Sequence, residues 1–589
     1  MQVLRSPYQP GSIVPNIGTM LLDNAARFAA APAFAERVHG PYRFWSWQDF
    51  AEDLRRVAAW LLRDQHTAGT AGGGRIAFVA GNSYARYVTE LATMATGLVT
   101  VPIFPGYPAE LTGRLIQFSD VDLVVTDQPE RVFALDPGVR PRRVLVLTEP
   151  DPAALAAFTA WGGSLYRLDP VLQTELPAEE RARVEATLRA VEPERLTLIM
   201  YTSGTSGFPK GVQLSHRNLM SQQQALAACW KPEPGLRLLS YLPWHHSFGG
   251  LFERFFAAHF GGCLALDDSC GRDVDRLLVN FAEIRPHVFF SVPKIYQEIV
   301  ARVQGSPAVE QAFFHPELRF VFTAAAPLPL STSVVFRDHG VPVVEGWGLT
   351  ETSPGVTLTE LELTRTPGVV GWPMAGIEVA LAEDGEILVR GPNVMSGYFR
   401  NDEATAAVFT ADGWFRTGDL GEFGPEGVRI LSRKERMFKL SNGEKVFPAQ
   451  IEQRVHSRCQ FVKYAYVFGS GLRAPCMLVF PNQQLFEGAA GGAGGPDCGR
   501  PADTAGLARC LSECVQAINA GQPARFEAVR RALVVGRELS IENNELTPSF
   551  KLIPRRIEER YADCIRAMQE ERYEDLPADV LPLTLVEPR

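Results

Sequence analysis

Short apolar runs alternate with amphipathic helical patterns along the first two thirds of the chain. Residues 75–81 and 121–127 are β-branched runs of strand length, whereas residues 19–30 and 47–62 place apolar side chains at helical spacing. Similar apolar runs return at residues 98–104, 142–148, 236–243, 287–292, 318–325 and 341–347. Strands that alternate with helices predict α/β layers built on a largely parallel sheet.

The chain is too long for one hydrophobic core, and its character changes toward the C-terminus. At 589 residues it exceeds the size at which single cores stop growing, so we expect at least two domains. From about Gly385 the strands become shorter, and residues 555–573 form a charged helical pattern. Residues 488–506 are rich in glycine, alanine and proline, which predicts a flexible surface loop.

Composition and charge exclude several classes of protein. A hydrophobic fraction of 46% excludes a disordered chain, and a net charge of −9 argues against nucleic acid as a partner. The longest uncharged stretch, residues 91–109, is broken by glycine and proline, so we predict no integral membrane segment. The first residues lack the pattern of a signal peptide, and we expect a cytoplasmic protein.

The cysteines and histidines show no metal-binding pattern. Nine cysteines without a Cys-x-x-Cys pair indicate a reducing compartment, and neither a disulfide scaffold nor a zinc site. Cys510 and Cys514 lie one helical turn apart without a nearby histidine, and we interpret them as core or surface thiols. The adjacent His245 and His246 lack a third ligand at helical or hairpin spacing, so zinc is not favoured there.

Residues 198–212, LIMYTSGTSGFPKGV, are the segment best suited to chemistry. An apolar strand runs into a loop of Ser, Thr and Gly that leads to Lys210. Glycines let backbone N–H groups approach phosphate oxygens, hydroxyls donate further hydrogen bonds, and lysine adds a compact positive charge. Pro209 before Lys210 excludes a Walker A loop. The segment predicts a phosphate cradle, with a Gly/Ser surface turn as the alternative.

Several motifs, in chain order, resemble the adenylate-forming superfamily of acyl-CoA synthetases, adenylation domains and beetle luciferases. Residues 201–212 differ from that family's YTSGTTGxPKGV signature only at Ser206, and residues 242–249, LPWHHSFG, are similar to its acyl-site motif. Motifs similar to the adenine-and-magnesium segment, the ribose-binding turn, the hinge and the terminal lysine segment lie at residues 345–351, 414–421, 432–448 and 545–556. The sequences of these motifs are most similar to those of the long-chain acyl-CoA synthetases.

This resemblance implies a fold and a division into domains. We expect a large layered α/β N-terminal domain with mostly parallel sheets and a distorted barrel, followed by a small mobile α+β domain. The expected boundaries are residues 1–432 for the N-terminal domain, 433–435 for the hinge and 436–589 for the C-terminal domain. Glu435 is the residue about which the small domain is expected to rotate between two half-reactions.

By the same resemblance, each part of ATP has a matched group of residues. Lys210 suits the pyrophosphate, Thr350 can donate to the α-phosphate, and Glu351 is matched to a Mg²⁺ ligand. Asp419 can accept both ribose hydroxyls and Arg433 contacts the ribose; the alternatives are a turn aspartate and a surface arginine. Trp347 and the small residues Ala324, Ala325 and Ala326 fit the walls of an adenine slot, and the alternative is buried core packing. The full ATP/AMP set is Thr202, Ser203, Gly204, Thr205, Ser206, Gly207, Lys210, Ala325, Ala326, Glu345, Gly346, Trp347, Thr350, Asp419 and Arg433.

Catalysis and the acyl group are assigned to a second set of residues. Lys551 is matched to the family's catalytic lysine, which contacts the α-phosphate and the substrate carboxylate and must then withdraw. His246, Phe248 and Gly348 are expected to line the acyl site. The candidates for the coenzyme A step are Lys439 and Gly443, and the predicted catalytic residues are Lys551, Lys210, His246, Thr350 and Glu351.

The implied function is that of an ATP-dependent acyl-CoA synthetase that uses Mg²⁺ and coenzyme A. It would activate a hydrophobic carboxylic acid as acyl-AMP, release pyrophosphate, and pass the acyl group to the thiol of coenzyme A. One alternative is an acyl-AMP ligase that loads a carrier protein's phosphopantetheine, and another is a specialised homologue that performs one half-reaction. The particular acid and the oligomeric state do not follow from the sequence.

Overall fold

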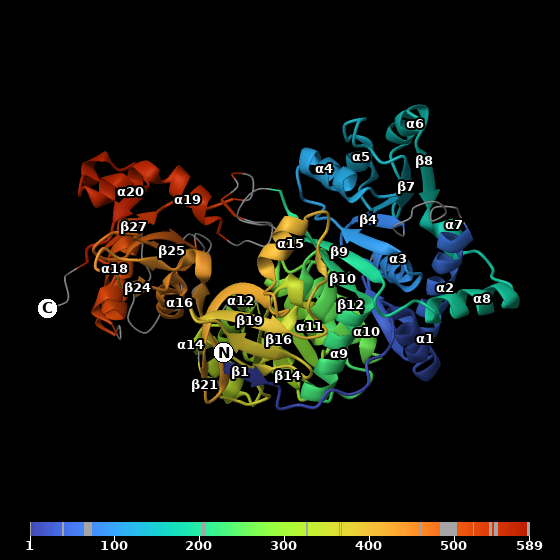
Figure 1. Cartoon of the computed structure of the whole chain (residues 1–589), viewed down its shortest axis with the longest axis horizontal. Helices are drawn as coiled ribbons and strands as arrows, with labels where there is room; N and C mark the ends of the chain where they lie inside the picture. The colour runs from blue at the N-terminus through green and yellow to red at the C-terminus, as the bar shows by residue number, and fades with distance from the viewer. Residues whose placement is uncertain are drawn as a thin grey trace.

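The computed structural model arranges its described residues into four sheets covered by helices (Figure 1). The described residues are 2–37, 40–63, 74–202, 208–324, 328–364, 366, 368–459, 461–482, 504–521, 524–540, 543, 545–546 and 552–585. Most of the predicted glycine-rich loop lies outside them. Its last residues, however, belong to helix α18 (Thr504–Ala520), so the loop prediction was wrong at that end.

An eight-stranded sheet contains the apolar runs of the N-terminal part. The strands from β9 to β8 run parallel, whereas β10 pairs antiparallel with both β9 and β20. The β9–β10 connection is too short for a parallel crossover. In sheet order the strands are β20 (Gly397–Tyr398), β10 (Lys210–Ser215), β9 (Leu196–Thr202), β5 (Val99–Pro102), β4 (Arg75–Val79), β6 (Leu123–Thr126), β7 (Arg143–Val146) and β8 (Ser164–Arg167).

A fourteen-stranded sheet contains the later runs. Its strands are parallel from β15 to β2 and antiparallel elsewhere. In sheet order they are β1 (Gln2–Arg5), β18 (Glu378–Leu381), β19 (Glu386–Arg390), β21 (Phe415–Gly424), β22 (Gly427–Arg433), β17 (Val369–Pro373), β16 (Gly355–Leu358), β15 (Val343–Gly348), β14 (Phe320–Thr323), β13 (Val288–Ser291), β11 (Arg237–Ser240), β12 (Cys263–Leu266), β2 (Pro32–Glu36) and β3 (Arg43–Ser46).

The α/β layering is confirmed, but two details of the expectation need correction. Within the described residues no sheet closes into a barrel, because closure requires the first and last strands to pair, and β1 and β3 are open edges of the long sheet. The sheets are also mixed: the eight-stranded sheet is largely parallel, whereas most neighbouring strands of the fourteen-stranded sheet are antiparallel. Short connections such as residues 425–426 between β21 and β22 allow only antiparallel neighbours.

Helices fill the space between the two large sheets and cover their outer faces. One core contains Phe78 of β4, Val88 of α3, Phe255 of α10 and Val288 of β13, so both sheets pack on the same helical layer. The helices of this part are α1 (Ile17–Arg27), α2 (Trp47–Arg63), α3 (Tyr84–Ala95), α4 (Ala109–Ser119), α5 (Pro129–Phe133), α6 (Pro152–Ala160), α7 (Leu168–Leu172), α8 (Ala178–Arg189), α9 (His216–Trp230), α10 (Arg254–His259), α11 (Val274–Ile284), α12 (Pro293–Gly305), α13 (Pro307–Phe313), α14 (Leu330–Asp338) and α15 (Asp402–Val408).

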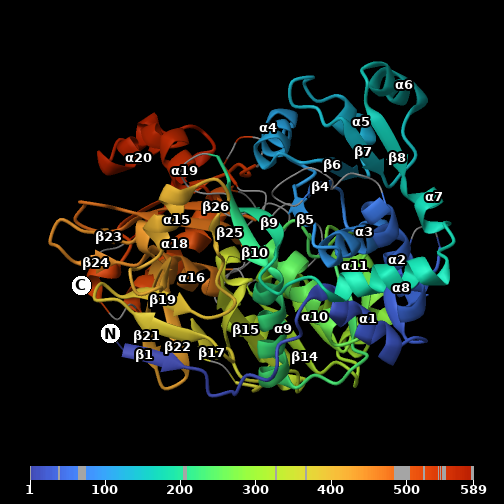
Figure 2. The same ribbon diagram turned by 45° about the vertical axis from the view of Figure 1, so that its right-hand side comes forward.

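The C-terminal elements form a smaller unit with its own sheet, drawn orange to red at the left of Figure 1; in Figure 2 strands of the N-terminal part overlap it. Along β25, Val467 faces a core with α16 and α18, while the next residue, Phe468, faces a core with α19 and α20. The elements are β25 (Val462–Phe468), β26 (Cys476–Pro481), β27 (Arg531–Val535), β28 (Val580–Pro582), α16 (Pro448–Arg458), α19 (Pro554–Arg560) and α20 (Ala562–Gln569), with β23 (Phe438–Lys439) and β24 (Lys445–Val446) as a separate ribbon.

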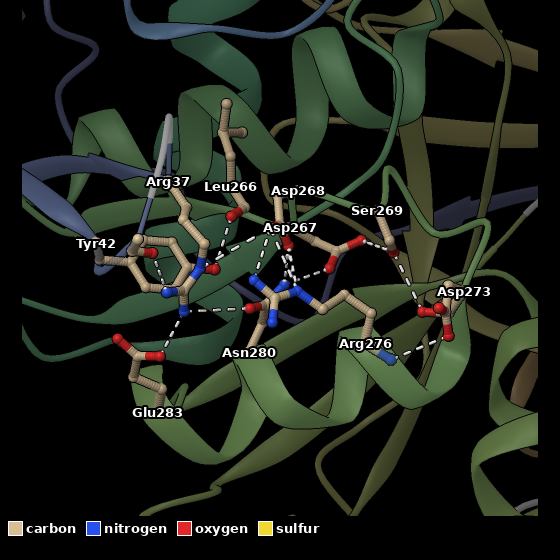
Figure 3. A network of polar contacts seen from close by, with 11 residues as sticks. Arg37, Tyr42, Leu266, Asp267, Asp268, Ser269, Asp273, Arg276, Asn280 and Glu283 are labelled. Atoms are coloured by element: carbon tan, nitrogen blue, oxygen red, sulfur yellow. Dashed lines mark hydrogen bonds and ion pairs between the residues drawn. The ribbon is translucent and has the colours of Figure 1, made fainter.

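A polar network fixes α11 to the end of β12 (Figure 3). Arg276 donates to both carboxylate oxygens of Asp268, at 2.9 and 2.7 Å, and Asn280 donates to Asp267 and Asp268 at 2.7 Å each. The hydrogen bonds from Arg276, acting against partial burial, lower the pKa of Asp268 to about 2. Asp268 therefore remains ionised in the folded chain at pH values where an unfolded aspartate is protonated.

Replacing Asp268 by asparagine should lower the free energy of unfolding by about 1 kcal/mol at pH 7. The folded pKa is lower than the unfolded value, so the stabilisation is present above about pH 4 and is lost as the pH falls toward 2. Urea midpoints at pH 7 and pH 3 measure this difference. Asp275→Asn is the control, because Asp275 is 74% exposed and pairs only with Arg302 among the described residues. Equal midpoints for wild type and Asp268→Asn at pH 7 would contradict the prediction.

Candidate active site

The predicted phosphate cradle connects β9 to β10. Thr202 and Lys210 lie opposite each other at the ends of these strands, and Oγ1 of Thr202 donates to the Lys210 carbonyl oxygen at 3.4 Å. The hairpin therefore brings the two ends of the loop together at the carboxyl end of β9, an edge of α/β sheets where ligands bind. The loop residues predicted for the cradle, Ser203, Gly204, Thr205, Ser206 and Gly207, lie outside the described residues.

A chain of contacts joins Lys210 to Glu351 through Tyr398. Nζ of Lys210 lies 5.0 Å from the centroid of the Tyr398 ring, and the Tyr398 hydroxyl donates to Oε1 of Glu351 at 2.8 Å. Burial and the Glu351 carboxylate raise the pKa of Tyr398 well above its usual value, so the hydroxyl stays protonated and continues to donate. The contact orients a carboxylate that retains further acceptor capacity, which suits a Mg²⁺ ligand.

Sequence reasoning missed Tyr398 as a site residue. Its only local signal is its place near the end of residues 385–401, GEILVRGPNVMSGYFRN, a segment that resembles a strand pair of the family. Its position in the site depends on the pairing of β20 with β10, in which Tyr398 lies opposite Val212. This pairing joins segments that are far apart in the sequence, so no local pattern predicts it.

Replacing Tyr398 by phenylalanine should weaken the apparent Mg²⁺ affinity of ATP activation about ten-fold. The ring beside Lys210 remains, but Glu351 loses the hydrogen bond that orients it. The measurement is the rate of ATP–pyrophosphate exchange as a function of Mg²⁺ concentration. Tyr201→Phe is the matched control, because Tyr201 lies on β9 beside β10 and its hydroxyl bonds Ser119 of α4 at 2.7 Å. An unchanged Mg²⁺ dependence in Tyr398→Phe would refute the orienting role.

Trp347, Asp419 and Arg433, predicted from separate motifs, form one cluster. Asp419 on β21 lies opposite Arg433 on β22, and Nε of Arg433 is 3.0 Å from Oδ1 of Asp419. Nε1 of Trp347 donates to Oδ2 of Asp419 at 2.9 Å. Both carboxylate oxygens are thus held in place, and a carboxylate oxygen can accept more than one hydrogen bond. The arrangement is suited to a ribose diol beside an aromatic slot.

The backbone of β15 needs glycine beside Trp347. A Cβ atom on Gly348 would lie 1.8 Å from the Pro354 carbonyl oxygen, and one on Gly346 would lie 2.6 Å from the Phe322 ring. Two residues after Gly348, the chain enters the short helix η2 (Thr350–Thr352), which carries Thr350 and Glu351. The adenine-side and magnesium-side candidates are therefore held on one continuous segment.

Glu345 has a structural role at the start of this segment. Its side chain is buried, and its Oε1 accepts a hydrogen bond from the backbone N–H of Leu328 at 3.0 Å. Glu345 thereby holds the end of the connection that includes Ala325 and Ala326. Those two alanines lie outside the described residues.

The predicted acyl-site loop contacts the predicted nucleotide site. Oγ1 of Thr350 donates to Oγ of Ser247 at 3.2 Å, next to His246. The backbone N–H of Phe248 donates to Nδ1 of His246 at 3.4 Å. Phe248 begins a π-helix, η1 (Phe248–Glu253), and its ring packs on Phe322 at 5.6 Å. The Thr350–Ser247 hydrogen bond therefore lies next to the packed rings of Phe248 and Phe322. π-Helical turns such as η1 are frequent at functional sites.

A buried ion network, missed in the sequence, supports this loop. Nε of Arg86 donates to Glu90 at 2.9 Å, and Nη1 of Arg254 lies 3.0 Å from the same carboxylate oxygen. Both guanidinium groups flank the ring of Trp244, at 5.7 and 5.4 Å from its centroid. Burial opposes ionisation of Glu90, but the two arginines hold its pKa below the usual value. Burial, together with Arg86, lowers the pKa of His245 to about 3, so that imidazole is neutral.

The predicted hinge residue Glu435 lies between Lys434 and Arg436, whose side chains form ion pairs with different parts of the chain. Nζ of Lys434 is 2.6 Å from Asp384, in the turn between β18 and β19. Nη2 of Arg436 is 2.7 Å from Glu452 on α16. One neighbour of Glu435 is thus tied to the large sheet and the other to the C-terminal unit. This anchoring is the arrangement expected of a pivot.

The remaining predicted residues lie in the C-terminal part. Lys439 ends β23 and is exposed, and Gly443 lies in the exposed turn before β24 with a φ of +86°, which favours glycine. Lys551 lies outside the described residues. The roles assigned to these three residues stay predictions.

Two family profiles match the chain. The profile described as AMP-binding enzyme matches residues 21–399, and that of the AMP-binding enzyme C-terminal domain matches residues 435–573. The chain belongs to the AMP-binding enzyme family. The first match contains Lys210, Trp347, Glu351 and Tyr398, and Asp419 lies between the two matched regions.

Curated relatives of this AMP-binding enzyme include fatty-acid ligases. The long-chain-fatty-acid–CoA ligase FadD15 of Mycobacterium tuberculosis is 27% identical, and the alignment covers 94% of this chain and 97% of the relative. Long-chain-fatty-acid–CoA ligase 1 of Homo sapiens is also 27% identical, over 74% of this chain and 69% of the relative.

Solved structures show the same fold. The O-succinylbenzoate coenzyme A synthetase of Bacillus subtilis in complex with AMP is 19% identical with a TM-score of 0.67, covering 92% of this chain and 97% of that one. The A domain of a carboxylic acid reductase from Segniliparus rugosus, in complex with AMP and a carboxylic acid, is 19% identical with a TM-score of 0.71, covering 95% and 94%. Among the described helices, none has the length and apolar character required to cross a membrane.

Proposed function

We propose that this AMP-binding enzyme is an acyl-CoA synthetase that works in two steps. A carboxylate attacks the α-phosphorus of ATP, which forms an acyl adenylate and releases pyrophosphate. The thiol of coenzyme A then attacks the acyl carbon, losing its proton, and AMP leaves. One observation supports this proposal most strongly: residues 347–351 carry both Trp347 and Glu351. This short segment therefore joins two groups of contacts, Lys210–Tyr398–Glu351 and Trp347–Asp419–Arg433.

The first step brings two anions together, so it depends on placed positive charge and aligned donors. Lys210 would supply charge at the pyrophosphate end, and Thr350 would donate to the α-phosphate. Asp419 and Arg433 hold the ribose, while Trp347 lies against the base. Glu351, oriented by Tyr398, would hold Mg²⁺, which neutralises phosphate charge when bound.

The acid is proposed to be hydrophobic. His246 lies near Phe248, whose ring packs in a cluster with Phe252, Phe290 and Phe322. A polar side chain beside a cluster of aromatic rings suits a carboxyl head with an apolar chain. The curated relatives named long-chain-fatty-acid–CoA ligases support the same substrate class.

The second step is proposed to use rotation of the C-terminal domain, residues 436–589, against residues 1–432. Lys551 serves the adenylation step and must leave before the thiol enters. Lys434 pairs with a turn of the large sheet and Arg436 pairs with α16, which supports Glu435 as the pivot. Lys439 and Gly443 are then candidates to face the site in the thiol-transfer state.

Acceptor competition tests the proposed transfer step. Preformed acyl adenylate on the enzyme is mixed with coenzyme A or with a phosphopantetheinylated carrier protein, and thioester formation is followed by mass spectrometry. Rapid formation of acyl-CoA supports the proposal. Transfer to the carrier with none to coenzyme A would instead identify an acyl-AMP ligase, and transfer to neither would leave an enzyme of one half-reaction.

A further inference from the structure

Three cysteine thiols that are scattered in the sequence meet in the core of the C-terminal unit. Cys459 is the C-cap of α16, and Cys510 and Cys514 lie one turn apart on α18. Their Sγ atoms all lie within 4.8 Å of one another. The three residues are only 3%, 8% and 3% exposed. The sequence showed only the Cys510–Cys514 pair, because Cys459 reaches it through the packing of α16 on α18.

This spacing is close to that of a metal–thiolate site. Zinc–sulfur bonds of about 2.3 Å in tetrahedral geometry place the sulfurs about 3.8 Å apart. The three thiols therefore need to close by about 1 Å or less, within the reach of side-chain rotation. Residues four apart on a helix share one face, so Cys510 and Cys514 can bind the same ion from α18 while Cys459 binds from α16.

We propose that Cys459, Cys510 and Cys514 form a three-thiolate site for Zn²⁺. An all-sulfur donor set selects thiophilic ions, chiefly Zn²⁺ and Cu⁺. The surrounding core is apolar, with Val455, Leu507 and others packed around the thiols. Three thiolates carry a net charge of −1 with Zn²⁺ but −2 with Cu⁺, and an apolar core disfavours the larger charge.

Binding of the ion releases the three thiol protons, and the three sulfurs supply three of the four positions of a tetrahedral site. Among the described residues, no other histidine, cysteine or carboxylate belongs to the cluster. The site would tie α16 to α18. Because Glu452 of α16 pairs with Arg436 beside the predicted hinge, bound zinc would also fix the helix on which that pivot is anchored.

Metal loading of the full-length, reduced protein tests the site. The chain is stripped with a chelator, incubated with Zn²⁺, desalted and analysed for metal content. We expect one tightly held zinc per chain and an X-ray absorption spectrum with three sulfur neighbours at about 2.3 Å. Cys510→Ser and Cys514→Ser should each weaken zinc binding at least about 100-fold, because one thiolate is lost.

The matched control is Cys564→Ser, which changes a cysteine of the same unit that is as buried as Cys510 but lies on α20. It should retain the zinc. The X-ray absorption spectrum of the wild-type protein tests for sulfur ligands to zinc even if the cluster variants fail to fold. No retained zinc, preference for Cu⁺ over Zn²⁺, a spectrum without sulfur neighbours, or equal retention in the folded cluster variants would each overturn the proposal.

Discussion

The Asp419→Ala enzyme is expected to lose ATP–pyrophosphate exchange by about 10³-fold in kcat/KM. Asp419 is the one carboxylate in the cluster, and it holds Arg433 and the Trp347 N–H while offering acceptors to the ribose diol. Removal leaves the indole N–H and the guanidinium without their shared partner. The loss combines the ribose hydrogen bonds with misplacement of both neighbours.

Glu422→Ala is the matched control for this prediction. Glu422 lies on the same strand, β21, but its side chain is 55% exposed and it pairs with Arg429 at 3.7 Å. Its removal should change the exchange rate less than two-fold, since exposed ion pairs contribute little. If Asp419→Ala exchanges pyrophosphate as fast as Glu422→Ala does, Asp419 does not hold the ribose.

Replacing Lys551 by alanine is expected to slow acyl-adenylate formation by about 10²- to 10³-fold. The reason is the loss of a compact cation that is proposed to contact both the α-phosphate and the attacking carboxylate in the first step. The second step should be spared, because the lysine has left the site before the thiol attacks. Single-turnover adenylation, compared with thiolysis of preformed acyl adenylate, separates these two steps.

Lys463→Ala is the control for Lys551. Lys463 also belongs to the C-terminal unit, on β25, where it pairs with Glu538 at 3.0 Å. It should leave both half-reactions unchanged. Equal slowing of adenylation and thiolysis in Lys551→Ala would indicate a general structural defect and would remove the assigned role.

Local patterns predicted the elements of the fold well. The apolar run at residues 75–81 became β4 (Arg75–Val79), and the amphipathic pattern at residues 47–62 became α2 (Trp47–Arg63). Such patterns depend only on the spacing of neighbours along the chain. Whether the described sheets close into a barrel depends on which distant strands pair at the sheet edges, and no periodicity contains that information.

The same distinction separates the site residues that could be predicted from those that could not. Trp347 and Asp419 each lie in a recognisable motif, and the structure joins them by a hydrogen bond. Tyr398 became a partner of Glu351 only through long-range strand pairing. Arg86 and Arg254 meet at Glu90 only because α3 and α10 pack together in one core.

Carboxylate-dependent exchange of labelled pyrophosphate into ATP tests the central claim most directly. The purified enzyme is incubated with ATP, Mg²⁺, labelled pyrophosphate and a panel of carboxylic acids from short polar acids to long-chain fatty acids, without coenzyme A. The account predicts exchange that requires an acid and is strongest with hydrophobic ones, because acyl-adenylate formation is reversible. Absence of exchange with every acid of the panel would contradict it.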